Sequence, residues 1–291
     1  MKKVWEHDLA AEERFSRRHD RRKPKGRRNV HALHLDHLED ASASSSAATF
    51  DEPGLQALFE RGYLSRLVGE LKSGKEATVY LAEGPRGLMA AKVYRDARVR
   101  SFKNDGVYRQ GRFIGDARVE KSIAQRSRHG VLAQQALWIY HEYRELWALH
   151  DAGLPVPTPM VGPGPDDIGM AGRVVLMGFV GDETGAAPRL SDLRLPPGAA
   201  ASAWAQSVDL LARLLALGKV HGDYSSYNLL WWQGRVCVID FPQLVTFGEN
   251  PQAGALLERD VASLCTSFRR HGIEAEPNAV LRQVRLQARR R

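Results

Sequence analysis

Cysteine is almost absent from this 291-residue sequence, which contains only Cys237 and Cys265. Neither residue belongs to a CxxC motif or a Cys/His cluster, which argues against a disulfide framework and a structural zinc site. Long apolar runs are also missing, since none approaches the roughly 20 residues that a membrane-spanning helix needs. The N-terminus is too charged for a secretory signal. We therefore expect a cytoplasmic protein with no membrane partner.

Acidic residues are fewer than basic ones, 34 against 42, which gives a net charge of +8. Such an excess indicates an anionic partner: a nucleotide, RNA or the ribosome, or an acidic protein. Nine basic residues lie between Arg14 and Arg28, and a Ser/Ala-rich stretch follows at 41–48. Residues 1–50 bury too little apolar surface to fold, so we predict a disordered tail. A solvated tail and an arm for nucleic acid or the ribosome both remain open.

Apolar periodicity after residue 50 is strand-like first and helix-like later. This order fits an α+β chain with a β-rich N-lobe at 51–180 and an α-rich C-lobe at 181–291 that ends in a basic C-terminus. A basic, irregular insertion is expected at 95–128. The expected strands are 67–69, 77–82, 88–94, 173–180 and 235–240, and the expected helices are 55–60, 131–150, 199–217 and 251–271.

The sequence His221-Gly-Asp-Tyr-Ser-Ser-Tyr-Asn228 carries the strongest chemical signal, and Asp240 follows it at the end of an apolar strand. Phosphoryl transfer needs a positioned acceptor and metal ions on the phosphates. Asp223 can accept the proton of an acceptor hydroxyl, while Asn228 and Asp240 can ligate a metal. Their spacing matches a kinase catalytic loop and its metal-binding Asp. Oxygen ligands favour Mg²⁺ or Mn²⁺.

Lys92 lies inside an apolar strand, Ala90-Ala-Lys-Val-Tyr94. A buried lysine is costly unless it is paired. In a kinase this lysine bridges the nucleotide phosphates and a helix carboxylate, which makes Lys92 a catalytic and ATP-binding candidate. Glu142 and Glu145 share one face of the next helix, and we favour Glu142. The alternative is a lysine at a strand edge that extends into solvent.

The segment Gly69-Glu-Leu-Lys-Ser-Gly-Lys-Glu76 nearly matches a P-loop, but Glu76 replaces the metal-binding Ser/Thr. A β-rich segment then follows where a P-loop requires a helix. We therefore predict a strand–turn–strand cover over the phosphates, formed by Ser73, Gly74, Lys75 and Glu76. A plain hairpin turn is the alternative.

The strand that ends at Val180 is the predicted adenine site. Apolar walls with backbone amides at one edge suit a planar base. Met177 would be the gatekeeper, and the backbone of Gly178, Phe179 and Val180 would be the hinge.

These stretches together resemble the RIO-type atypical serine/threonine protein kinases over roughly residues 65–272. The resemblance is carried by residues 73–80, 91–94, 100–103, 153–157, 185–190, 221–228, 239–243 and 259–260. It implies a bilobal, protein-kinase-like fold with a reduced C-lobe. It also implies ATP with a divalent ion, a Ser/Thr autokinase or ATPase activity, and no conventional activation loop. Only 51 residues follow Asp240, and they contain no Ala-Pro-Glu. Eukaryotic members act in ribosome maturation; the Arg- and Ala-rich composition here looks bacterial.

Two other functions remain open. A small-molecule kinase of the aminoglycoside-phosphotransferase type shares the HGD…N and IDF motifs. An ATP-switched RNA- or ribosome-binding factor would explain the basic termini. The protein substrate is unknown and can be the chain itself: we expect autophosphorylation in the 95–128 insertion, at Ser101 rather than Ser122 or Ser127, although an inert insertion is the alternative.

Overall fold

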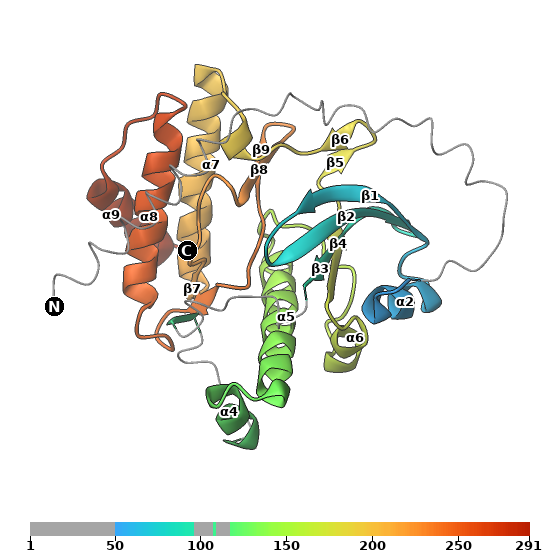
Figure 1. Cartoon of the computed structure of the whole chain (residues 1–291). Helices are drawn as coiled ribbons and strands as arrows, with labels where there is room; N and C mark the ends of the chain where they lie inside the picture. Colours follow the sequence, from blue (N-terminus) through green and yellow to red (C-terminus); the bar gives the residue numbers. More distant parts are fainter. Residues whose placement is uncertain (1–49, 96–106, 109–116) are drawn as a thin grey trace, which may run out of the picture. The chain divides into compact units, whose positions relative to one another are not determined.

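Four antiparallel strands form the sheet of the N-lobe, in the order β1-β2-β3-β4 (Figure 1). The computed structural model describes residues 50–95, 107–108 and 117–291, so nearly all of the predicted tail lies outside the described residues. Each strand pairs with the next along the sheet. The helices α4, α5 and α6 lie between β3 and β4 in the chain. The strands are β1 (Arg66–Ser73), β2 (Ala77–Gly84), β3 (Gly87–Tyr94) and β4 (Val174–Gly178).

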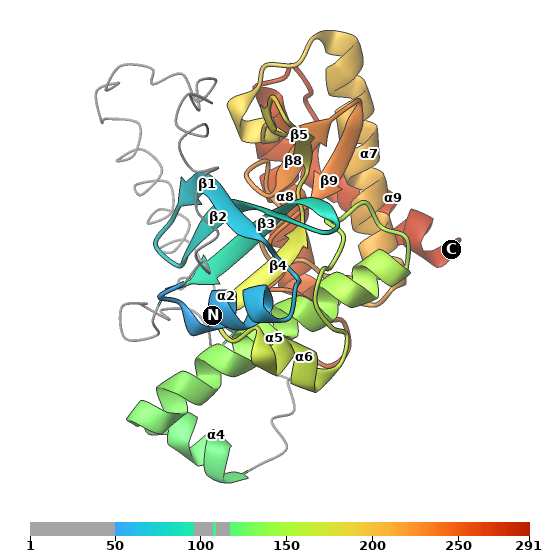
Figure 2. The ribbon, with the colours of Figure 1, turned by 90° about the vertical axis from the view of Figure 1, so that its right-hand side faces the viewer.

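One long helix, α5 (Arg128–Asp151), connects the sheet to the rest of the molecule (Figure 2). The hydroxyl of Tyr143 donates to the carbonyl of Val174 at 2.9 Å and accepts from the amide of Leu176 at 2.7 Å. These two bonds fix α5 on β4 and leave no polar atom of Tyr143 unpaired in the core. Two shorter helices lie beside them, α2 (Pro53–Glu60) and α6 (Pro165–Met170).

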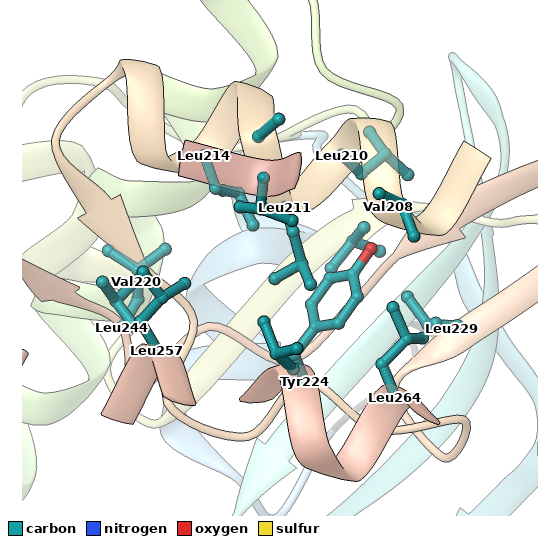
Figure 3. Close-up of a cluster of buried hydrophobic side chains, with 14 of the residues drawn as sticks. Val208, Leu210, Leu211, Leu214, Val220, Tyr224, Leu229, Leu244, Leu257 and Leu264 are labelled. Atoms are coloured by element: carbon teal, nitrogen blue, oxygen red, sulfur yellow. The ribbon is translucent and has the colours of Figure 1, made fainter. Parts of the chain in front are cut away.

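The C-lobe is built on three helices: α7 (Pro197–Ala216), α8 (Ala253–Arg269) and α9 (Pro277–Arg289). Its core is an apolar cluster in which Leu211, Leu229 and Leu264 surround the ring of Tyr224 (Figure 3). The hydroxyl of Tyr224 donates to the carbonyl of Ser207 at 2.9 Å. The smaller elements are β5 (Gly181–Asp182), β6 (Gly185–Ala186), η3 (Leu190–Asp192), β7 (Lys219–Val220), β8 (Leu229–Trp232), β9 (Arg235–Val238) and β10 (Val245–Thr246).

The predicted strand and helix order is confirmed, including a strand rather than a helix directly after Glu76. The prediction that all of 95–128 is irregular is wrong, because α4 (Ala117–Ala124) forms there and packs on α5. Its single buried residue is Ile123. A Cβ at Gly130 would lie 2.0 Å from the carbonyl oxygen of Ser122, so glycine is what permits this close approach.

The basic C-terminus is a second correction, because α9 is an amphipathic helix that packs against α7 and α8. Its N-terminus is capped by Glu276, whose carboxylate accepts from the amides of Asn278 and Ala279. Val280, Leu281 and Val284 form its buried face. Five arginines in the last ten residues obscured this apolar spacing.

We predict that Val284→Asp lowers the free energy of unfolding by about 3 kcal/mol or more, since it buries an unpaired carboxylate. For a domain of this size that corresponds to a Tm decrease of roughly 6–12 °C. Leu286→Asp is the matched control, because Leu286 is 52% exposed while Val284 is fully buried. Equal melting temperatures of the two variants, measured by circular dichroism, would mean that α9 does not pack as described.

Candidate active site

Lys92 lies between two carboxylates where the lobes meet. Its Nζ is 2.7 Å from Oε1 of Glu142 and 2.6 Å from Oδ1 of Asp240. The hydroxyl of Tyr94, two residues along β3, donates to the other oxygen of Glu142. Burial alone would lower the pKa of Lys92, but the two carboxylates outweigh it and raise that pKa well above its ordinary value. The lysine is therefore held in its charged form.

Helical geometry explains which glutamate meets this lysine. Glu142 lies on the side of α5 that faces β3, whereas Glu145 pairs with Lys219 of β7 at 3.0 Å. Both glutamates are 1% exposed. The structure thus brings Lys92 together with the glutamate that the sequence favoured and places the alternative elsewhere.

Asp223 and Asn228 meet across one turn of the loop between β7 and β8. The side-chain amide of Asn228 donates to the carbonyl of Asp223 and to its carboxylate Oδ2, both at 2.9 Å. Desolvation by the surrounding residues and repulsion from Asp240 together raise the pKa of Asp223 to about 7, although the residue keeps an exposed surface. A carboxylate with a near-neutral pKa is suited to exchange a proton at physiological pH.

A buried aspartate holds this loop in place. Asp260 of α8 accepts from the backbone amides of Gly222 and Tyr224 at 2.8 and 3.0 Å. Gly222 adopts φ +79°, and a Cβ there would lie 2.8 Å from the carbonyl oxygen of Gln243, so only glycine fits. The residues before and after Asp223 are thus held in place, which fixes the backbone position of Asp223 itself.

His221 is fully buried behind Asp223. Its Nδ1 lies 3.3 Å from the amide of Asp223, and its Nε2 lies 3.3 Å from the carbonyl of Ile239. Burial lowers the pKa of His221 to about 4, so the ring is neutral at pH 7. It accepts from the amide through Nδ1 and donates to the carbonyl through Nε2, which links the two loops that carry Asp223 and Asp240.

Asp240 follows β9 with φ +73°, in the left-handed region where aspartate is more tolerated than most residues. The amide of Ile239 donates to the carbonyl of Asn228 at 3.0 Å, directly beside the first residue pair of the β8–β9 hairpin. This bond brings the two candidate metal ligands, Asn228 and Asp240, to the same end of the hairpin. Among the described residues no group of three His, Cys, Asp or Glu could hold a metal by itself. One carboxylate and one amide suit Mg²⁺, which in phosphoryl-transfer sites takes most of its other ligands from phosphates and water.

The turn between β1 and β2 lies after Ser73. The hydroxyl of Ser73 is 3.3 Å from the hydroxyl of Thr78 and accepts a hydrogen bond from Arg95 at 2.9 Å. The amide of Gly74 donates to the carbonyl of Ala77. This is the predicted strand–turn–strand geometry. Whether Ser73, Gly74, Lys75 and Glu76 cover phosphates stays a prediction.

The predicted adenine strand runs between the two cores. Met177 contacts both apolar clusters. The amides of Gly178 and Phe179 donate to the carbonyls of Thr158 and Leu88, at 2.7 and 3.2 Å. Those two amides are therefore engaged by the fold. The hinge role of Gly178, Phe179 and Val180 stays a prediction.

Comparison with known proteins decides the family. The RIO domain model matches residues 78–280, more than half of the chain. The chain belongs to the RIO domain family. This RIO chain is 33% identical over 226 residues to the Schizosaccharomyces pombe serine/threonine-protein kinase rio1, covering 74% of this chain but 41% of that protein. It is 30% identical to the RIO-type kinase Rio1 of Haloferax volcanii, covering 80% and 74%.

A solved structure confirms the RIO fold. The structure described as the Rio2 kinase-ADP/Mg2+-phosphoaspartate complex from Chaetomium thermophilum aligns with a TM-score of 0.57 at 20% identity, covering 87% of this chain and 74% of that one. The predicted bilobal, kinase-like α+β fold is thus correct. The chain spans about two fifths of the yeast relative's length. The relatives named are fungal and archaeal, so the bacterial origin stays a prediction.

Two further cations of this RIO domain, Lys72 and Arg189, lie near Asp240. Lys72 of β1 has a lowered pKa because of burial and the nearby Arg189, while Asp192 and Asp240 oppose the shift. Lys92 is the main cause of the lowered pKa of Asp240, and Arg189 adds to that effect. Lys72 directly precedes Ser73, and Arg189 lies in the 185–190 stretch that carries the resemblance, but no motif spacing singles out either side chain.

Of the three serines considered as phosphorylation sites, two lie in the described part of the chain. Ser101 lies outside the described residues. Ser127 caps α5 by accepting from the amide of Gly130 at 3.0 Å, and its hydroxyl is 2.6 Å from that of Ser122. No helix of the described residues is long and apolar enough to cross a bilayer. The lobe boundaries and the roles of the site residues stay predictions.

Proposed function

We propose that this RIO chain is an ATP-dependent phosphotransferase, a serine/threonine protein kinase with autokinase or ATPase activity. The observation that supports it best is the ammonium of Lys92 held between Glu142 and Asp240. A buried lysine fixed in its charged form by two carboxylates suits the recognition of polyphosphate. Glu142 would orient Lys92 toward the nucleotide, as the motif spacing predicts.

Asp223 would orient the acceptor and take its proton. The acceptor oxygen forms a bond to the γ-phosphorus as the bond to the β-phosphate oxygen breaks, and ADP leaves with that electron pair. The acceptor's proton passes to the carboxylate of Asp223, which returns it to water. Asn228 keeps Asp223 in place through two 2.9 Å hydrogen bonds.

Mg²⁺ or Mn²⁺ would be held by Asp240 and Asn228. When bound, the ion supplies positive charge that offsets the charge of the phosphates. The side chain of Asp240 is 42% exposed, so its carboxylate is reachable from the cleft while one oxygen still pairs with Lys92. Lys72 and Arg189 would add positive charge near Asp240.

The test is to incubate the full chain with γ-labelled ATP and Mg²⁺ or Mn²⁺, and to trace the label. Acid-stable label on the chain or on an added protein supports serine/threonine transfer. Label that hydroxylamine removes indicates an acyl phosphate on a carboxylate, and free phosphate indicates an ATPase. Label only on a small aminated alcohol would favour the small-molecule kinase. ATP that stays intact with both metals would overturn the proposal.

The adenine site provides a separate prediction. Met177→Trp adds bulk beside the hinge and is expected to weaken ATP binding at least tenfold, because overpacked contacts cannot relax between two cores. Met177→Leu conserves volume and is the control, with expected affinity close to that of wild type. Titration calorimetry measures both. Unchanged affinity in Met177→Trp would move the adenine pocket elsewhere.

RNA or the ribosome is the second candidate partner, and α9 favours it. Arg282, Arg285 and Arg289 are exposed along this helix, opposite its buried face. Arginines on a rigid helix can contact successive phosphates of a nucleic acid. RNA binding that weakens steeply with salt, and that depends on these three arginines, would support the partner; salt-independent binding would not.

A further inference from the structure

The helix that carries Glu142 is attached to both lobes by charged groups. Toward the N-lobe, Glu142 meets Lys92 at 2.7 Å. One turn later, the carboxylate of Glu145 faces the C-lobe and lies 3.0 Å from Nζ of Lys219. Figure 1 shows α5 between the sheet and the segment that contains β7. The first contact belongs to the nucleotide site, whereas the proposed function gives the second no part.

Glu145 is the centre of a compact network. Its Oε1 accepts from Arg144 at 2.9 Å, and Nδ1 of His141 lies 3.8 Å away. Lys219 also donates to Oγ1 of Thr246 at 3.2 Å. Burial alone would raise the pKa of Glu145, but His141 and Lys219 outweigh it, so the carboxyl is held ionised.

The network reaches both catalytic loops through short stretches of backbone. Lys219 precedes His221 and Asp223 by two and four residues. On the same helix, Nε2 of His141 lies 2.8 Å from the carbonyl of Leu244, four residues after Asp240. Val220 and Leu244 point into the same apolar cluster (Figure 3). The C-lobe segments that contact α5 are therefore anchored in the packed apolar core of that lobe.

A buried ion pair is weak support for stability, because a hydrophobic pair of similar volume is often as stable. What the pair does provide is a fixed position between its two segments. We propose that Glu145 and Lys219 are positioning residues: they hold α5 against the C-lobe, so that Glu142 stays in register with Lys92. The effect on ATP rests on the proposed function, while the tether itself does not.

The first test needs no nucleotide. In the full chain, Lys219→Met should increase hydrogen exchange of the α5 amides around residues 138–149 about tenfold or more. Arg144→Met is the matched control, because Arg144 also contacts Glu145 but lies on α5 itself with a side chain that is 57% exposed, so its loss leaves the contact with Lys219 in place. We expect the control to exchange like wild type. Equal protection of α5 in Lys219→Met and wild type would overturn the tether.

The second test measures affinity for the magnesium complex of a non-hydrolysable ATP analogue. Lys219→Met and Glu145→Met should each weaken it roughly tenfold, or about 1.4 kcal/mol. In a Glu142→Gln background, Lys219→Met should cause no further loss, because its effect passes through Glu142. An additive loss, or a lower Tm with unchanged affinity, would reduce the pair to a purely structural role. A wild-type chain that fails to bind the analogue would contradict the proposed function, and hydrogen exchange would still decide the tether.

Discussion

Replacing Asp223 with alanine is expected to reduce phosphoryl transfer by about 10²- to 10⁴-fold, the usual contribution of a positioned acid or base. ATP affinity should change by no more than about twofold, because this carboxylate acts on the acceptor and not on the nucleotide. Its contacts agree with that role: Asn228 holds Asp223 at 2.9 Å, whereas Lys92 pairs with Asp240. Single-turnover transfer and titration calorimetry on the same preparation measure both quantities.

Asp182→Ala is the matched control for this variant. Asp182 is an exposed aspartate in β5 whose carboxylate accepts from the amide and the hydroxyl of Thr184. We expect its transfer rate to equal that of wild type. Turnover at the wild-type rate in Asp223→Ala would end the assignment of this loop as catalytic.

Replacing Lys92 with methionine is expected to weaken ATP binding and transfer together. A charge-assisted hydrogen bond contributes about 1.5–3 kcal/mol, so the loss in affinity should be roughly 10- to 100-fold. The lysine would contact phosphate in both the ground state and the transition state, which is why both quantities fall. Lys121→Met, at an exposed position of α4, controls for the loss of one positive charge.

Folding must be checked in the Lys92 variant, because its two carboxylates lose their partner. Burial already raises the pKa of Glu142, against the opposing charge of Lys92. Without the lysine we expect Glu142 to take up a proton and remain paired with Tyr94. A folded Lys92→Met chain that binds and turns over ATP like wild type would show that the nucleotide lies elsewhere.

The proximity of the candidate site residues was predictable because it depends on short spacings in the sequence. Asp223 and Asn228 are five residues apart in one loop, and Asp240 ends the next strand, so their approach follows from local structure. Glu142 could be favoured over Glu145, but only the packing of α5 distinguishes them: one faces β3 and the other faces β7.

The missed features depend on contacts between distant segments or on weak patterns. α9 was hidden because arginines fill its exposed face, and α4 because it buries only Ile123. Asp260 lies in the 259–260 stretch that carries the resemblance, but only the packing of α8 shows that it holds the loop of Asp223 from 36 to 38 residues away. Lys219 likewise looks like an ordinary surface lysine until α5 is placed beside it.

Metal dependence of ATP turnover tests the central claim most directly. The full chain is incubated with labelled ATP and Mg²⁺, then with a chelator in excess, and then with Mg²⁺ restored. We predict loss of the γ-phosphate with Mg²⁺, a background rate under chelation, and recovery when the metal returns. Asp223→Ala is expected to stay close to the background rate under all three conditions. Turnover that persists under chelation and in Asp223→Ala, or no turnover with either Mg²⁺ or Mn²⁺, would contradict a phosphotransferase built on Lys92, Asp223 and Asp240.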